Sequence, residues 1–209
     1  MRISYKKDLI LRAYHNTKLF KNMSTTKIGN PAVVGLAGFG LTTLLLQFHN
    51  LGLMGLGPVL AMAFIFGGLA QMIAGFAEQK CGNNFGFAAF TGYGAFWIGL
   101  GIIWLLNYHG IYTSSGTDVG YYLIVWTIFT AILTYASLYI HTAMTFTFVT
   151  LLLGFILLDL GHFGFPTLNI VAGYELIVCA CAALYMLAGI VINDVAGKVV
   201  LPMGKPIKK

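Results

Sequence analysis

Six long apolar stretches are the feature that most limits how this chain can fold. They cover residues 31–49, 58–77, 85–108, 120–140, 144–163 and 168–192, and each is near the roughly 20 residues that cross a bilayer as a helix. Charged residues are only 9% of the chain, whereas a soluble domain carries about 25%. The stretches are continuous rather than alternating, which favours helices over a membrane β-barrel. We therefore expect an all-α integral membrane protein with six transmembrane helices in one bundle.

The basic residues predict how the helices are oriented. Seven of the twelve Lys and Arg precede the first stretch, four follow the sixth, and Lys80 lies between the second and third. An even number of spans places all of them on one side, which the positive-inside rule assigns to the cytoplasm. We expect a basic cytoplasmic tail (1–27), a six-helix transmembrane domain (28–197) and a second basic cytoplasmic tail (198–209), in a multi-pass protein of the cell membrane.

No motif indicates an enzyme, a metal site or a nucleic-acid interface. Cys179 and Cys181 are separated by one residue and lack the spacing and histidine partners of a zinc site. We expect them to pack as small hydrophobic groups. The sequence predicts no catalytic residue, no metal, no cofactor and no nucleic-acid partner.

Polar side chains follow one face of the first stretch. Read as a helix, Phe39, Thr43, Leu46, Gln47 and Asn50 recur at steps of three and four residues, which places them together. Lipid does not solvate hydroxyl and amide groups, so this face is expected to look at protein or at a water-filled path. Two interpretations stay open: the polar groups line a path, or they only hydrogen-bond between helices.

Aromatic residues recur at helical spacing in the third stretch. Phe90, Tyr93 and Trp97 share one face there, and Leu151 is part of a similar face in the fifth stretch. Together with Phe39, this pattern fits a narrow apolar constriction in a wet path, which gates by losing its water. The residues by themselves favour the other interpretation, which is ordinary packing between helices.

Ionisable residues inside the stretches are few. Glu175 lies about a third of the way into the sixth stretch, where a charged carboxylate costs about 3 kcal/mol or more unless it is paired, protonated or near headgroups. His49 ends the first stretch, and imidazole groups exchange protons near neutral pH. Both are candidates for proton handling. Asp159 and His162, one turn apart near the end of the fifth stretch, are typical of an interfacial ion pair.

Three segments of the chain resemble the acetate uptake transporter family. These are NPAVVGLAGFGLTTLLLQFHN at 30–50, GGLAQMIAGFAEQKCGNNFGFAAFTGYGAFW at 67–97 and LPMG at 201–204. The family contains bacterial acetate/succinate–proton symporters and yeast acetate transporters linked to ammonia export. The resemblance covers about residues 27–204 and is strongest in the first three stretches.

The resemblance implies a transporter or anion channel for acetate and related small monocarboxylates, with succinate included in some members and proton linkage expected. It implies a homohexamer in membrane lipid with one pore through each protomer. It also implies a hydrophobic neck of Phe, Tyr and Leu. These fall by motif on Phe39 and Tyr93, and on Leu151 by a gapless match through the fifth stretch.

Polar groups on either side of this neck are expected to hold the carboxylate. The candidates are Thr42, Thr43, Gln47, Asn50, Asn83 and Asn84. Two positions depart from the expected pattern: Gln47 stands where an Asn is expected, and Ile190 where one member of the family has a Glu. Two alternatives remain: a channel for ammonia or another small solute, which His49 favours, and a membrane scaffold that transports nothing.

Overall fold

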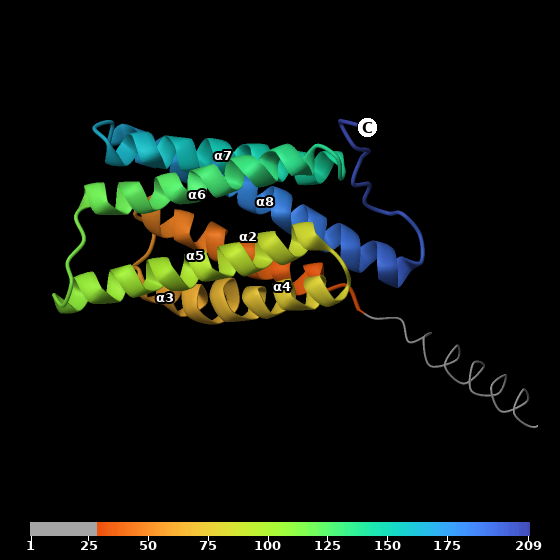
Figure 1. The fold of residues 1–209 in the computed structure, drawn as a ribbon, viewed down its shortest axis with the longest axis horizontal. Helices are drawn as coiled ribbons and strands as arrows, with labels where there is room; N and C mark the ends of the chain where they lie inside the picture. The colour runs from red at the N-terminus through yellow and green to blue at the C-terminus, as the bar shows by residue number, and fades with distance from the viewer. Residues whose placement is uncertain (1–28) are drawn as a thin grey trace, which may run out of the picture. The chain divides into compact units, whose positions relative to one another are not determined.

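The computed structural model describes residues 29–209, and the expected basic tail at 1–27, with residue 28, lies outside them. The described residues form a helical unit, Pro31–Lys209, whose elements are α2 (Ala32–Asn50), α3 (Gly57–Phe64), η1 (Ile65–Ala70), α4 (Gln71–Lys80), α5 (Asn84–His109), α6 (Gly116–Ser137), α7 (Thr142–His162) and α8 (Thr167–Ala196) (Figure 1). Because α3, η1 and α4 are continuous, residues 29–209 contain six helices that are long and apolar enough to cross a membrane. The prediction of a six-helix, all-α membrane bundle is confirmed.

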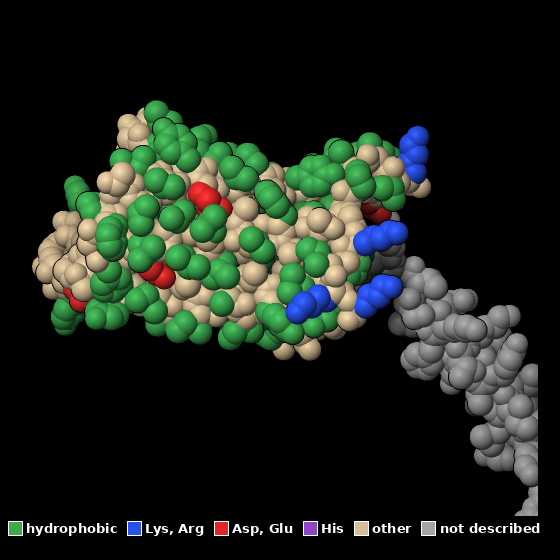
Figure 2. Space-filling view, turned by 90° about the horizontal axis from the view of Figure 1, so that it is seen from above, with side chains coloured by type: hydrophobic (Ala, Val, Ile, Leu, Met, Phe, Trp, Pro, Cys, Tyr) green, Lys and Arg blue, Asp and Glu red, His purple; other side chains and the backbone are tan. Residues whose placement is uncertain are grey.

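Successive spans run in opposite directions, which gives the bundle two distinct ends (Figure 1). Helices α2, α5 and α7 begin at the end where α4, α6 and α8 finish. We call it the lysine end because it holds every Lys of residues 29–209, namely Lys80, Lys198, Lys205, Lys208 and Lys209. Figure 2 shows these cationic side chains gathered toward one end of the molecule. The opposite end carries His49, His109 and His162 in the last turns of α2, α5 and α7, and we call it the histidine end.

The outer face of the bundle is apolar. Along α6 the exposed residues recur at steps of three and four, at Tyr121, Val125, Ile128, Ile132 and Tyr135. In water such a continuous apolar stripe is unfavourable, but lipid tails are as apolar as these side chains. Exposure on this face therefore fits a helix that has lipid or another span as its neighbour.

Glycines allow the spans to approach at backbone distance. A Cβ built on Gly38 of α2 would lie 2.6 Å from the carbonyl oxygen of Phe66, and one on Gly75 of α4 would lie 2.6 Å from the backbone nitrogen of Thr91. Phe66 belongs to η1, a π-helical turn that interrupts the second span and that the sequence did not predict. Such turns insert an extra residue into a helix and are frequent at functional sites.

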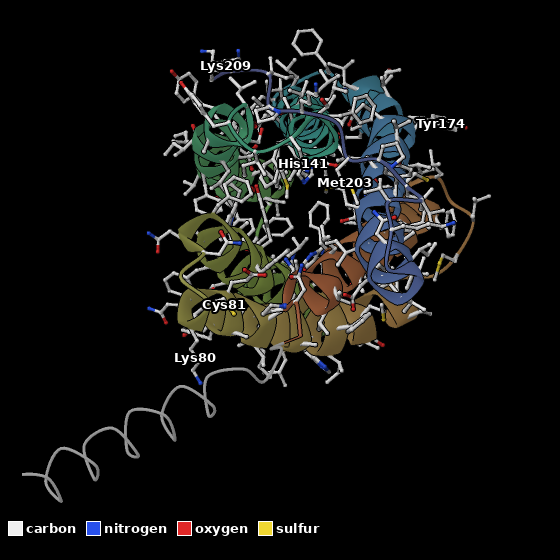
Figure 3. All side chains as sticks on the ribbon, turned by 90° about the vertical axis from the view of Figure 1, so that its right-hand side faces the viewer. Lys80, Cys81, His141, Tyr174, Met203 and Lys209 are labelled. Carbon is white, nitrogen blue, oxygen red and sulfur yellow. The ribbon has the colours of Figure 1, made fainter. Side chains whose placement is uncertain are left out.

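The C-terminal segment after α8 crosses the lysine end of the bundle. The Tyr185 hydroxyl donates to the Pro202 carbonyl at 2.8 Å, the Ala143 N–H donates to the Met203 carbonyl at 3.0 Å, and the Ile207 N–H donates to a carbonyl of the α6–α7 turn at 2.9 Å. Figure 3 looks onto this end and labels Met203 beside α7 and α8. This segment therefore ties together the ends of α6, α7 and α8.

Candidate transport path

Three cavities follow one another through the interior of the bundle. The inner cavity, of about 60 Å³, is lined by residues at the starts of α2, α5 and α7, such as Ala32, Phe85 and Met144. The middle cavity, of about 40 Å³, lies at mid-span. The outer vestibule, of about 420 Å³, is lined by residues at the far ends of the same helices, such as Asn107 and His162. The cavities therefore lead from the lysine end to the histidine end.

Phe39, Tyr93 and Leu151 are the residues that line both the inner and the middle cavity. They come from α2, α5 and α7, and all three are buried. The rings of Phe39 and Tyr93 have centroids 5.7 Å apart at an interplanar angle of 51°, within the usual range for aromatic rings in contact. We call these three residues the neck, because they are the part of the lining that the two cavities share.

The hydroxyl of Tyr93 is directed into the packing between helices. It lies 2.9 Å from the Thr130 hydroxyl of α6, and Thr130 is fully buried and borders none of the three cavities. Phe129 packs edge-on against the Tyr93 ring with centroids 5.6 Å apart. The aromatic ring, rather than the hydroxyl, is therefore the part of Tyr93 that borders the path.

A second apolar set separates the middle cavity from the outer vestibule. Leu46, Phe96 and Leu158 line both spaces. Phe96 is held by neighbouring rings, with Trp126 and Phe155 at centroid distances of 5.4 and 5.6 Å. Two apolar sets of side chains therefore lie between the three spaces.

Polar groups of α2 border the middle cavity, as the face pattern predicted. The Gln47 side chain donates to the Thr43 carbonyl at 3.1 Å, and Asn50 donates to the Gln47 side-chain oxygen at 3.0 Å. The Thr43 hydroxyl is buried and has no hydrogen-bond partner among residues 29–209. Thr43 and Gln47 line the middle cavity and Asn50 the outer vestibule, so this face borders both spaces.

Gln71 is a site residue that the sequence analysis missed. Its side chain is 0% exposed, it lines the inner cavity, and neither its oxygen nor its nitrogen has a partner in the described part of the chain. An unsatisfied buried amide costs about 1–3 kcal/mol, so its atoms need a ligand or water. The one signal in the sequence was an isolated amide between apolar neighbours.

Asn83 also borders the inner cavity, but its amide is engaged. Its oxygen accepts from the Gly86 N–H at 3.1 Å and caps α5, while its nitrogen donates to the Glu78 carboxylate at 2.7 Å. Asn84, the first residue of α5, is exposed and lines none of the three spaces. Thr42 does not line them either, because its side chain packs against Gly67 of η1.

The two candidates for proton handling lie outside the path. His49 has its Nδ1 atom 3.0 Å from the Met54 carbonyl oxygen, in the turn after α2. Glu175 packs against Gly154 of α7, and both of its carboxyl oxygens are buried without a partner among residues 29–209. Neither residue lines the cavities or the vestibule.

Asp159 and His162 interact electrostatically, as expected of neighbours one turn apart, but the hydrogen bond that Asp159 accepts comes from another helix. Asp159 accepts a hydrogen bond from the Thr127 hydroxyl at 2.7 Å, and His162 is its electrostatic neighbour while lining the outer vestibule. Within residues 29–209, no group of three His, Cys, Asp or Glu side chains is placed to hold a metal ion.

Six spans around small cavities in line, with apolar barriers between them, define a membrane protein that passes small solutes. The sequence model of the GPR1/FUN34/yaaH family matches residues 13–204, and the chain belongs to this family. It is therefore a transport protein of the acetate transporter family rather than an enzyme, and a multi-pass integral protein of the cell membrane.

Relatives of known name agree with this assignment. The succinate-acetate/proton symporter SatP of Escherichia coli is 40% identical over 186 residues, which are 88% of this chain and 99% of SatP. Acetate permease A of Emericella nidulans is 36% identical over 157 residues, 69% of this chain and 53% of the permease. A solved structure of the bacterial acetate channel SatP superposes with a TM-score of 0.82 at 40% identity, covering 85% of this chain and 100% of the other.

Proposed function

We propose that this protein passes acetate and related small monocarboxylates, with succinate within its range, through one pore in each protomer. The observation that carries the proposal is the neck, whose three residues separate two small cavities that each border buried polar side chains. A water molecule needs about 10–15 Å³ of such space. The cavities of about 60 and 40 Å³ therefore hold roughly four water-sized groups each, the size of an acetate ion.

The dry neck favours passage of the neutral acid, and so a link to protons. A carboxyl group with an ordinary pKa near 4 is protonated about one part in a thousand at pH 7, which corresponds to about 4 kcal/mol. Moving a bare carboxylate into an apolar space costs more, several kcal/mol even after relaxation. Protonating the substrate is thus the cheaper route past Phe39, Tyr93 and Leu151.

Polar side chains on either side of the neck are proposed to hold the carboxylate. Thr43 and Gln47 act in the middle cavity, and Asn50 acts at its outer border. Gln71 acts in the inner cavity, because neither polar atom of its amide has a partner among residues 29–209. Asn83 has both amide atoms engaged, so its part is to shape the inner cavity.

The protons are proposed to travel with the substrate. Thr42, Asn84, His49 and Glu175, which the sequence also suggested, lie outside the cavities and need a rearrangement before they could contact a solute. A substrate that crosses the neck as the neutral acid carries its own proton. No titratable side chain of the pore is then required for the linkage.

Two further parts of the proposal concern the arrangement in the membrane. The lysine end faces the cytoplasm, because all cations of residues 29–209 lie there. The chain assembles as a homohexamer, as the resemblance implies, and this is tested by the particle mass of the detergent-purified protein.

The test is uptake of labelled acetate into proteoliposomes, with and without an inward proton gradient. Unlabelled succinate, lactate and ammonium are the competitors. We expect saturable uptake that the carboxylates inhibit and that the gradient accelerates. Phe39→Ala widens the neck and is expected to change the rate without loss of assembly, whereas Val125→Ala on the exposed face of α6 is the matched control and leaves the rate unchanged.

Each alternative has its own outcome in this experiment. If ammonium inhibits uptake and carboxylates do not, the protein is an ammonia channel. A relative from Saccharomyces cerevisiae is named ammonia transport outward protein 2. It is 35% identical over 147 residues, which are 66% of this chain and 52% of that protein. If the assembled protein passes neither solute and Phe39→Ala has no effect, the scaffold interpretation holds.

A further inference from the structure

The two ends of the bundle differ in the kind of positive charge that they carry. Within residues 29–209, every Lys lies at the lysine end and there is no Arg. An anion that approaches from the histidine end therefore meets no permanent cation of the described chain. Among residues 29–209, the groups at this end that can become positive are the imidazoles of His49, His109 and His162.

These three histidines sit in comparable backbone positions. Each lies in the last turn of a helix that runs toward this end, α2, α5 or α7. What distinguishes the three residues is where their side chains go.

Only His162 among them borders the outer vestibule. His49 is bound to the Met54 carbonyl in the turn after α2, and His109 is exposed beside the Tyr108 ring, with centroids 5.2 Å apart. The other polar side chains of the vestibule are neutral: Asn50, Asn107, Ser114, Ser115 and Asn169. A proton on His162 thus gives a neutral chamber its one positive charge.

Asn169 supplies a second polar group in the same chamber. It belongs to the first turn of α8, it lines the vestibule, and its side-chain oxygen is buried without a partner among residues 29–209. An amide carries an NH2 donor as well as this oxygen, and the donor is the group that would bind a carboxylate. With about 420 Å³, the vestibule has room for a hydrated carboxylate beside His162.

The described acids near His162 do not line the vestibule. On α7, Asp159 lies one turn earlier, is an electrostatic neighbour of His162 and accepts a hydrogen bond from the Thr127 hydroxyl of α6. On α6, the Asp118 carboxylate accepts from the Ser115 N–H and hydroxyl, both at 2.7 Å. On α8, Glu175 packs against α7 and does not line the vestibule.

We propose that His162 is the carboxylate-capturing residue of the outer vestibule. Its protonated ring, together with the Asn169 amide, holds the anion before it passes the Leu46–Phe96–Leu158 barrier. Capture from the histidine end then strengthens when that side is acidified, because imidazoles gain their proton between about pH 8 and pH 5. The inference rests on the proposed carboxylate transport and adds a substrate site and its pH dependence.

The test measures initial rates of labelled acetate uptake over a range of concentrations in proteoliposomes whose histidine end faces the bath. Orientation is measured with an impermeant maleimide that reacts with Cys81, an exposed thiol at the lysine end. Molecules whose Cys81 does not react have the lysine end inside the vesicle and the histidine end facing the bath. Rates are taken at a bath pH of about 5.5 and about 8, on either side of the imidazole range. Two substitutions of His162 and one control are compared with the unmodified protein.

His162→Gln removes the charge but keeps a polar side chain. It is expected to raise the KM for acetate about fivefold at acid pH, the effect of losing one exposed ion pair, with an unchanged maximal rate and no effect at alkaline pH. His162→Lys keeps a charge at both values and is expected to lower the alkaline KM about fivefold. His109→Gln, from the same end but outside the vestibule, is expected to change neither value.

A His162→Gln effect of the same size at both pH values overturns the proposal, because a merely structural role is independent of protonation. So does a His162→Lys variant that leaves the alkaline KM unchanged. If the unmodified protein takes up no acetate, the proposed function itself fails. If it takes up acetate and the KM ratios do not depend on pH, only the role of His162 fails.

Discussion

Tyr93 offers the sharpest test of how the neck works, because its ring and its hydroxyl have separate surroundings. The ring borders the two cavities, whereas the hydroxyl lies 2.9 Å from that of Thr130 in the packing between α5 and α6. Tyr93→Phe removes only the hydroxyl and leaves the barrier in place. We therefore expect nearly unchanged acetate flux and a small loss of stability.

The magnitudes separate the two roles clearly. A hydrogen bond between transmembrane helices contributes about 0.6 kcal/mol on average and up to about 1.7, and 1 kcal/mol shifts the melting temperature of a chain of this size by roughly 2–4 °C. If the hydroxyl instead held the carboxylate, its loss would cost about 1.5–3 kcal/mol of binding. That corresponds to a loss of roughly tenfold or more in flux at low acetate.

The assay pairs acetate uptake into proteoliposomes with thermal unfolding in detergent. Thr130→Val is the matched control, because it removes the same hydrogen bond from a residue that borders none of the three spaces. Each variant is expected to melt about 2–4 °C lower with flux within about twofold of the unmodified protein. The double variant is expected to lose little more than either single one, since the two residues share one interaction.

A particular pattern of results refutes this reasoning. If Tyr93→Phe loses flux about tenfold while Thr130→Val does not, the hydroxyl contacts the solute rather than α6. The neck would then be a binding site and not a dry barrier.

Three further outcomes follow from the same structure. Leu151→Ala removes one side of the neck and is expected to admit lactate and succinate faster, at a stability cost of about 2–5 kcal/mol; unchanged competition by these acids would contradict it. Gly38→Ala places a Cβ 2.6 Å from a backbone oxygen of η1 and is expected to cost about 1–3 kcal/mol, seen as less assembled protein in size-exclusion chromatography. Burial lowers the pKa of His141 below its usual 6.5, and its neutral Nδ1 accepts from the Met144 N–H at 3.1 Å to cap α7. The stability that this hydrogen bond contributes is therefore complete above pH 6.5. It is lost as the pH falls from 6.5 toward the lower pKa of the folded protein, so acidification should lower the melting temperature. His141→Asn should remove this pH dependence.

The apolar pattern predicted the spans well because each depends on local sequence. A helix that crosses lipid must be about 20 residues long and must satisfy its own backbone, so the length and continuity of each stretch carry the information. The observed helices begin and end within about four residues of the predicted stretches. That Thr43, Gln47 and Asn50 share one face of α2 could be predicted for the same reason, since helical spacing places them together.

Gln71 shows where this reasoning stops. Its neighbours in sequence are apolar, and nothing in their spacing says that the span departs from an α-helix at Ile65–Ala70. The close contact between Gly38 and Phe66 is a property of two helices packed together. Only that packing shows that the Gln71 amide borders the inner cavity.

Thr42 and His49 show the opposite error, because the sequence suggested both as site residues and neither lines the cavities or the vestibule. Both lie next to residues that line the path, and their chemistry suits a solute or a proton. A helix turns by about 100° per residue, so Thr42 meets η1 whereas Thr43 meets the middle cavity. The His49 ring lies within hydrogen-bond distance of the Met54 carbonyl oxygen in the following turn.

The sequence by itself determined that this chain is a six-span membrane bundle with its lysines at one end, because lipid selects residues by their polarity one span at a time. The tertiary structure decided which polar side chains border the path, and it brought residues of three helices together as the neck. The physical reason is that lipid sets the outside of each helix independently, whereas a cavity exists only between helices. Its lining depends on the direction in which each packed side chain points.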